Sequence, residues 1–219
     1  MREMEEIERL QSYINYELKN LKDCMKTVKE ALETKERSHI LIKGLEGKEI
    51  DYIGELLGNT DFSKIIFKFP EILESSFFIT FYAFLENRLI GLCEILRVKR
   101  KYSLKISDIK GGGITAAQIY IKKLAKLPFP DQSSYWDDIC TYRHIRNYIV
   151  HRDGKIADKN KELEEKIKKF RKRGLLVDLT SGKHISLSKG FCSKFVNIME
   201  DFLQELFKGI MNETNRAQT

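Results

Sequence analysis

The sequence is poor in the residues that cross-link a chain or interrupt its helices. It contains four cysteines, three prolines and one tryptophan in 219 residues, and no Cys-x-x-Cys pair. Disulfide-rich scaffolds and zinc knuckles both need closely spaced cysteines, so the sequence excludes both classes. We interpret the cysteines as reduced thiols within predicted helices and expect a cytoplasmic protein; they are Cys24, Cys93, Cys140 and Cys192.

Signatures of several common enzyme classes are also missing. The sequence has no serine-hydrolase elbow, Walker motif, dinucleotide-binding glycine signature or closely spaced metal-binding set of His and carboxylates. Residues 44–49 do not form a phosphate loop, because Glu49 stands where a Ser or Thr would follow Lys48. We therefore predict a site without a metal or a cofactor.

Long apolar runs are lacking as well. The longest, Phe77 to Leu85, is broken by Thr80 and is far shorter than the roughly 20 residues that span a bilayer. The first residues lack the apolar core of a signal peptide, so we expect no membrane association. The net charge of +7 permits a polyanionic partner, but alone it favours nucleic acid only slightly.

Helical periodicity is abundant. Apolar residues recur at three- and four-residue spacing over residues 5–36, 70–101, 114–126, 134–152 and 188–210. Residues 175–187 alternate instead, as two strands do that turn at Ser181 and Gly182. We therefore predict an all-α fold, a bundle of about five to six helices with a small β-hairpin near residues 175–187.

The pattern predicts a helical core with two attachments. Residues 1–68 are expected to be an N-terminal helix and a glycine-containing connector, residues 69–210 a helical domain, and residues 211–219 a frayed tail. The first helix has a narrow apolar stripe from Ile7 to Leu32. Such a stripe suits an ordinary packed helix or a partner helix on a second subunit.

The most apolar helix, residues 70–101, is the expected centre of the bundle. Glu86 interrupts the edge of its inner face, where a carboxylate is costly unless a cation meets it. We expect either that Arg146 is this cation or that Glu86 turns outward to its own helix. The inner face comprises Phe78, Tyr82, Leu85, Leu89, Leu92 and Leu96.

Residues 134–154 carry the most unusual surface. Ser134 is the expected N-cap of a helix that ends before Gly154. At about 100° per residue, one arc of this helix is apolar, with Ile139, Tyr142, Ile145, Ile149 and Val150. The opposite arc gathers groups that bind phosphate or move protons, on Cys140, Arg143, His144, Asn147 and His151.

The segment Arg146-Asn147-Tyr148-Ile149-Val150-His151 resembles the motif of HEPN domains (higher eukaryotes and prokaryotes nucleotide-binding). The motif ends a helix that follows a long apolar helix and a connecting helix, so the resemblance covers roughly residues 70–208. It implies a metal-independent endoribonuclease, a toxin or antiviral-defence effector. Arg146 would contact the phosphate, His151 would move the proton and Asn147 would orient one of them, with support from Glu86, Arg143 and His144.

A basic run is the best candidate for further RNA contact, although such a run is also typical of a solvated helix face. Its predicted RNA-binding residues are Lys168, Lys169, Arg171, Lys172 and Arg173. On a regular helix, Arg146 and His151 diverge by about 140°. We therefore expect a homodimer in which the motif helices of two copies face each other across a two-fold axis.

Two interpretations without catalysis stay open. In one, the chain is a HEPN-like binding or dimerisation module, in which Arg146 pairs with Glu86 and His151 stabilises the C-terminal end of its helix. In the other, it is an interaction protein, such as an antitoxin or another member of a defence system, that binds RNA or protein without cutting.

Overall fold

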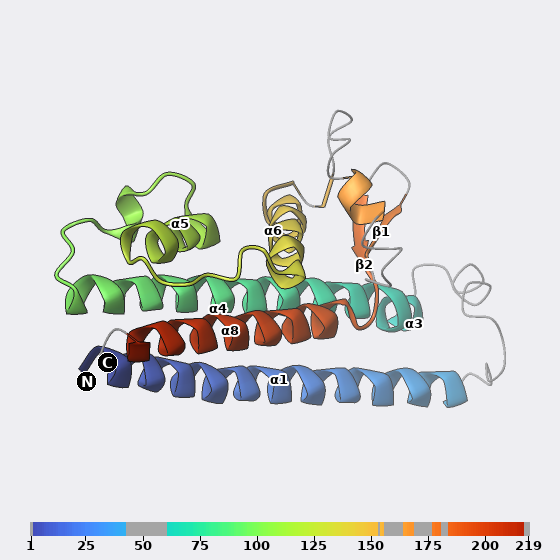
Figure 1. Ribbon diagram of the computed structural model, residues 1–219. Coiled ribbons are helices and arrows are strands. Elements are labelled where there is room, and N and C mark those ends of the chain that lie inside the picture. The colour runs from blue at the N-terminus through green and yellow to red at the C-terminus, as the bar shows by residue number, and fades with distance from the viewer. Residues whose placement is uncertain are drawn as a thin grey trace. The chain divides into compact units, whose positions relative to one another are not determined.

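The computed structural model describes residues 2–42, 61–152, 154–155, 164–168, 177–180 and 184–216. Within these ranges the fold is all-α apart from two short strands, as the sequence predicts (Figure 1). The helices are α1 (Arg2–Ile42), α3 (Asp61–Ser63), α4 (Phe69–Lys99), α5 (Gly113–Ile119), α6 (Ser134–Arg152) and α8 (Phe191–Arg216). The strands are β1 (Val177–Thr180) and β2 (His184–Leu187), and π-helical turns occupy Lys64–Lys68 and Tyr120–Leu124.

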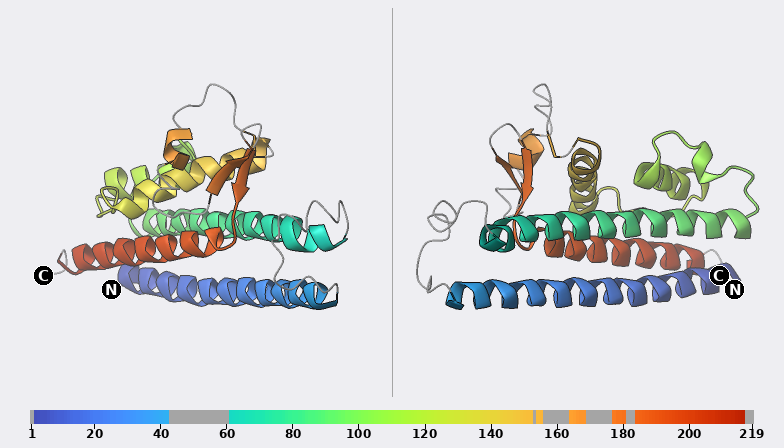
Figure 2. Two further views of the ribbon diagram at one scale, coloured as in Figure 1. Left: turned by 90° about the vertical axis from the view of Figure 1, so that its right-hand side faces the viewer. Right: turned by 180° about the vertical axis from the view of Figure 1, so that it is seen from behind.

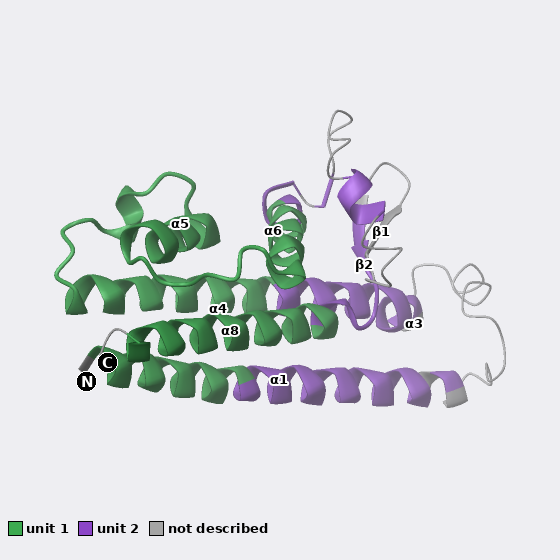
Figure 3. Cartoon of the chain, viewed as in Figure 1, with its two compact units in different colours: residues 1–18, 79–147, 193–219 green, residues 19–78, 148–192 purple. Residues whose placement is uncertain are grey.

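The chain forms two compact units (Figure 3). Unit 1 comprises residues 1–18, 79–147 and 193–219, and unit 2 comprises residues 19–78 and 148–192. The helices α1, α4, α6 and α8 each begin in one unit and end in the other. The predicted division at residues 68 and 210 follows the order of the sequence, whereas each unit joins segments that are distant along the chain.

Unit 1 is built on segments of α1, α4 and α8 that run side by side (Figures 1 and 2). Tyr82 on α4 stacks with Phe195 on α8 at 6.0 Å between ring centres, and Tyr142 on α6 meets the same ring at 4.8 Å. Two ion pairs join α1 to the end of α4, Lys99 with Glu6 and Arg100 with Glu3. The predicted inner face of α4 is confirmed, since each of its six residues is at most 1% exposed.

The motif helix α6 has nearly the predicted ends. The N-cap is Ser133, one residue before the predicted Ser134. Ser133 Oγ accepts a hydrogen bond from the Trp136 amide at 3.3 Å, and the helix begins at Ser134. It ends at Arg152, and Gly154, with φ 74°, donates its amide to the Tyr148 carbonyl at 2.9 Å. Glycine adopts such a positive φ without steric cost.

The apolar arc of α6 is shorter than predicted. Val150 is 44% exposed and Ile149 is half-buried, so the expectation that both belong to the core was wrong for Val150. The buried stretch of α6 ends at Ile145, and it includes Asp138 at 3% exposure. Angular spacing identifies the face that packs, but it does not tell how far along the helix the packing extends.

In unit 2, β1 and β2 pair antiparallel with Asp178 opposite Ser186, which confirms the predicted strands; residues 181–183, where the turn was expected, lie outside the described residues. The amide of Ile185 donates to the Gly154 carbonyl at 2.9 Å and thereby ties β2 to the end of α6. Phe78 meets Phe191 edge to face at 5.1 Å.

Unit 2 also contains a buried carboxylate that the sequence analysis did not identify. Glu74 on α4 is 2% exposed. It accepts hydrogen bonds from Lys29 Nζ at 2.6 Å and from the amides of Gly190 and Cys192 at 2.9 Å each. These two amides lie where α8 begins, so Glu74 caps that helix from a distant part of the sequence.

The first and last long helices continue past their predicted C-terminal ends. The prediction placed the first helix at residues 5–36 and the last at residues 188–210, whereas α1 spans Arg2–Ile42 and α8 spans Phe191–Arg216. All four cysteines lie in helices as predicted, and burial raises the pKa of both Cys93 and Cys192 to about 12. None of the helices in the described ranges is long and apolar enough to cross a membrane.

Candidate functional site

The predicted site residues of unit 1 gather where α6 meets α4. At about 100° per residue, Arg146 falls inside the apolar arc of α6, between the positions of Tyr142 and Ile139. It is accordingly half-buried, and its Nη2 lies 4.0 Å from Glu86 Oε2 on α4. Of the two expectations for Glu86, the structure therefore shows the contact with Arg146.

Two further neighbours hold the Arg146 guanidinium. Its Nη1 donates to Asn147 Oδ1 at 2.9 Å, and its Cζ lies 5.7 Å from the ring centre of Tyr82. Its Nε is buried and meets no acceptor within the described residues. A buried donor without an acceptor is costly. The Arg146 side chain is 24% exposed, so the outer part of its guanidinium can meet an incoming anion.

A second guanidinium belongs to the same cluster. Arg143, one turn before Asn147 on α6, donates from Nη1 to Thr115 Oγ1 on α5. Burial raises the pKa of the Tyr82 hydroxyl, and the Glu86 carboxylate raises it further, whereas the charges of Arg143 and Arg146 oppose the rise. We call Tyr82, Glu86, Arg143, Arg146 and Asn147 the Arg146 cluster. With Arg143, Arg146 and Glu86 ionised, these three groups give the cluster a net charge of +1.

A glycine at the start of α5 makes room for Glu86. Gly113 has φ 51°, and a Cβ added to it would overlap Glu86 Oε1. The carboxylate therefore lies directly against the backbone of α5, and a side chain at this position would have to displace it. Gly113 thus leaves the room that Glu86 occupies.

Replacing Gly113 with alanine is expected to push the Glu86 carboxylate away from Arg146. Gly112→Ala is the matched control, because Gly112 also has a positive φ, 59°, but no atom lies within 4 Å of its added Cβ. Gly113→Ala should lose about 1–2 kcal/mol of stability from its positive φ. Gly112→Ala should lose about 1–3 kcal/mol, because Gly112, with φ 59° and ψ 165°, lies in a region that is essentially confined to glycine. Only Gly113→Ala should also reduce the activity tested below, and adding Glu86→Gln to it should cause little further loss. Equal activity of the two alanine variants would contradict this role for Gly113.

His151 lies on the same helix but not in the Arg146 cluster. It is exposed in the last turn of α6, which runs as continuous α-helix from Ser134 to Arg152. Arg146 belongs to unit 1 and His151 to unit 2. The structure therefore brings together Arg146, Asn147 and Glu86, with Arg143 nearby, and leaves the imidazole open to solvent; His144 is half-buried.

The predicted RNA-binding run is described only at its beginning. Residues 164–168 are helical, and Lys168 pairs with Glu165 at 2.7 Å on the exposed surface. Exposed pairs of this kind contribute little to stability and leave the lysine available. The other residues predicted to bind RNA, Lys169, Arg171, Lys172 and Arg173, lie outside the described residues.

Sequence reasoning missed the parts that Tyr82, Thr115 and Gly113 have in the cluster. Tyr82 was assigned to the core, which is correct, but it also lies four residues before Glu86 and hence on the same side of α4. That spacing was the available signal for Tyr82. Nothing in the sequence connects Thr115 to Arg143, because their contact depends on where α5 packs.

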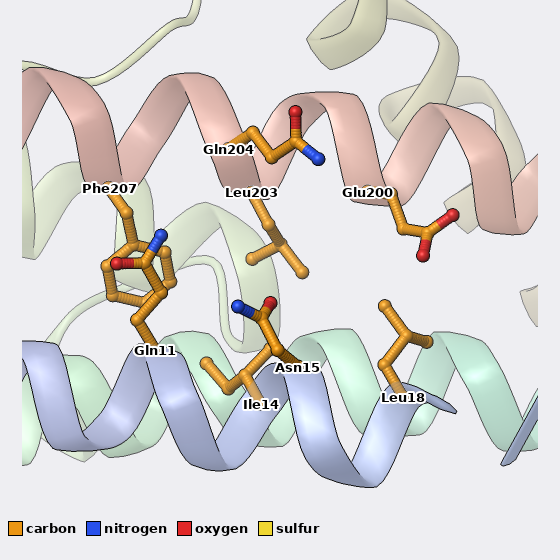
Figure 4. A pocket seen from close by; sticks show the side chains of 8 residues that line it. All are labelled: Gln11, Ile14, Asn15, Leu18, Glu200, Leu203, Gln204 and Phe207. Carbon is orange, nitrogen blue, oxygen red and sulfur yellow. The ribbon is translucent and has the colours of Figure 1, made fainter. Parts of the chain in front are cut away.

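Other features of the described residues offer less chemistry. A pocket of about 80 Å³ lies between α1 and α8, with Ile14 and Phe207 among its apolar residues and the Gln11, Asn15 and Gln204 amides around them (Figure 4). It is much smaller than the roughly 300–1,000 Å³ of ordinary ligand sites. No three His, Cys, Asp or Glu side chains gather as a metal site within the described ranges. Comparison of the chain with protein-family models, curated proteins and solved structures found no match.

Proposed function

We propose that this protein is a metal-independent endoribonuclease of the HEPN type, which cleaves RNA through the substrate's own 2′-hydroxyl. The observation that carries the proposal is the Arg146 guanidinium, which contacts Glu86, Tyr82 and Asn147 and whose side chain is 24% exposed. The same helix carries the exposed imidazole of His151. A fixed guanidinium and an accessible imidazole are the two groups that this reaction needs.

The groups divide the chemistry between them. The substrate 2′-oxygen attacks the adjacent phosphorus while a His151 imidazole accepts its proton, and the bond from phosphorus to the 5′-oxygen breaks. An imidazolium returns a proton to the leaving 5′-oxygen. Arg146 stabilises the negative charge on the phosphate oxygens, and Asn147 holds the guanidinium in place.

The proposed active form is a homodimer. One copy aims Arg146 and His151 in directions about 140° apart, so a single α6 does not direct both at one phosphate. A second copy related by a two-fold axis supplies its own His151 opposite the first. In such a cleft, one imidazole can accept the proton while the other donates one.

The resemblance to HEPN proteins supports a setting in a toxin–antitoxin pair or an antiviral system. The partner would then be RNA, together with an antitoxin or another defence protein. Expression in a bacterial host tests this setting: the wild-type protein should arrest growth and degrade cellular RNA, and His151→Ala should do neither. Harmless expression of both proteins would argue against a toxin.

A second candidate function is a HEPN-like binding or dimerisation module without catalysis. One observation favours it: the contacts of Arg146 with Glu86 and Tyr82 are also those of an arginine whose role is to hold α6 on α4. In that case Arg146→Ala destabilises the fold, whereas His151→Ala changes nothing. The two functions are thus separated by the effect of the histidine.

The chemistry of the cleavage products tests the proposal directly. Purified protein should release fragments with a 2′,3′-cyclic phosphate or 3′-phosphate and a 5′-hydroxyl, because the attacking oxygen belongs to the substrate. Chelators should not slow the reaction. Dependence on magnesium, or products with a 5′-phosphate, would instead indicate a metal-activated water and refute the mechanism.

A further inference from the structure

Arg88 on α4 carries a charge that no carboxylate neutralises within the described residues. Its guanidinium contacts two aromatic rings of unit 1, with Cζ 5.2 Å from the ring centre of Tyr13 on α1 and 5.2 Å from that of Phe84. By contrast, Arg97 and Arg100, which follow on the chain, each pair with a glutamate. Arg88 is therefore held by stacking rather than by an ion pair.

The donors of this guanidinium lack acceptors. Nε of Arg88 is buried without a hydrogen-bond partner in the part of the chain that the structure describes. Nη1 and Nη2 make no protein hydrogen bond there either, and they are not buried. These terminal nitrogens form the planar fork of every guanidinium, which binds phosphate or carboxylate oxygens.

Exposed aromatic rings lie beside this fork. Tyr13 is 48% exposed and Tyr16 is 63% exposed. They are three residues apart on α1 and therefore share one face of the helix, on which the exposed Arg9 lies one turn earlier. Exposed rings next to a guanidinium are the combination with which proteins bind single strands, since bases stack on the rings and phosphates meet the cation.

We propose that Tyr13, Tyr16 and Arg88 form a docking surface for single-stranded RNA, outside the Arg146 cluster. The choice of RNA rests on the proposed function. A phosphate chain supplies an anion at every nucleotide, whereas a second copy of a chain with net charge +7 is a poorer source of one. Paired bases are already stacked on each other, so the surface selects single strands over duplexes.

Binding of a 2′-O-methyl RNA of about ten nucleotides tests the surface without cleavage, because this RNA lacks the attacking hydroxyl. Tyr13→Leu and Tyr16→Leu should each weaken binding about fivefold to 150-fold. Arg88→Met keeps an unbranched apolar side chain beside the rings, and it should weaken binding and reduce the salt slope by about 0.7. Arg97→Met is the matched control, since it removes the same charge from α4 but at a guanidinium paired with Glu94; its affinity should equal that of the wild type.

Parallel assays with unmodified RNA separate this inference from the proposed function. Unchanged affinity of the Arg88 and tyrosine variants, with cleavage intact, would overturn the surface and leave the nuclease standing. Weakened binding by these variants, without any cleavage by the wild type, would support the surface and refute the nuclease. Equal affinity of the wild-type protein for duplex and single-stranded RNA would overturn the proposal. So would variants that change self-association in sedimentation but keep the wild-type affinity for RNA, because the surface would then bind a second copy of the chain.

Discussion

Replacing His151 with alanine is expected to slow RNA cleavage by about a hundredfold to ten-thousandfold, the usual cost of removing a positioned acid–base group. The imidazole is exposed, so its removal should change the free energy of unfolding by less than about 0.5 kcal/mol. Cleavage rates on one RNA, measured alongside urea unfolding of each variant, distinguish a loss of chemistry from a loss of folding.

Arg152→Ala is the matched control for His151→Ala. Arg152 is the next residue, is equally exposed and lies over the Tyr148 ring with its Cζ at 5.3 Å. It has no role in the proposed reaction, so its loss should leave the cleavage rate close to that of the wild type. A decrease below about tenfold in His151→Ala would remove the histidine from the mechanism.

Variants of Arg146 extend the same test to the shared site. Arg146→Lys should lose most of the activity, because an ammonium group cannot both donate to Asn147 and reproduce the planar fork toward a phosphate. If two copies complete the site, mixing inactive Arg146→Ala with inactive His151→Ala protein should restore part of the activity. Light scattering should then find a dimer, and full activity of a strictly monomeric protein would refute the shared site.

The fold was largely predictable because its central helix has a simple pattern. All six predicted inner residues of α4 are buried, since an apolar stripe at helical spacing has few ways to avoid water. The ends of elements were less predictable. Ser133 and Ser134 are adjacent and equally good caps, and only the observed hydrogen bond to Trp136 distinguishes them.

Less of the candidate site was predictable, because its contacts join residues that are distant in the sequence. The cost of a carboxylate at the edge of the inner face of α4 indicated that Glu86 needs a cation, and Arg146 was the expected partner. The places of Gly113 and Arg88 depend on how helices pack against each other. Periodicity carries no information about such tertiary contacts.

Glu74 is the second residue whose loss should have a large effect, and here the effect is on stability. A helix leaves its first amides without partners inside the helix, and α8 satisfies two of them, on Gly190 and Cys192, through the buried Glu74 carboxylate. The negative charge is also favourable near a helix N-terminus. Lys29 Nζ contacts the same carboxylate, but its side chain is 23% exposed and can regain water.

Glu74→Ala is therefore expected to lower the free energy of unfolding by about 3 kcal/mol, mainly because two amide donors lose their acceptor. For a chain of this length, that corresponds to a decrease in the melting temperature of about 6–12 °C. Glu74→Gln should lose less, because its amide oxygen remains an acceptor for one of the two amides.

Glu71→Ala provides the matched control for Glu74→Ala, since Glu71 lies one turn earlier on α4 and pairs with Lys68 at 3.3 Å on the surface. Exposed pairs of this kind contribute up to about 1 kcal/mol, so Glu71→Ala should change stability by no more than that. Urea titrations of both variants compare the losses under one condition. If Glu74→Ala were as stable as Glu71→Ala, the carboxylate would not be the cap of α8, and the amides of Gly190 and Cys192 would have to find acceptors elsewhere.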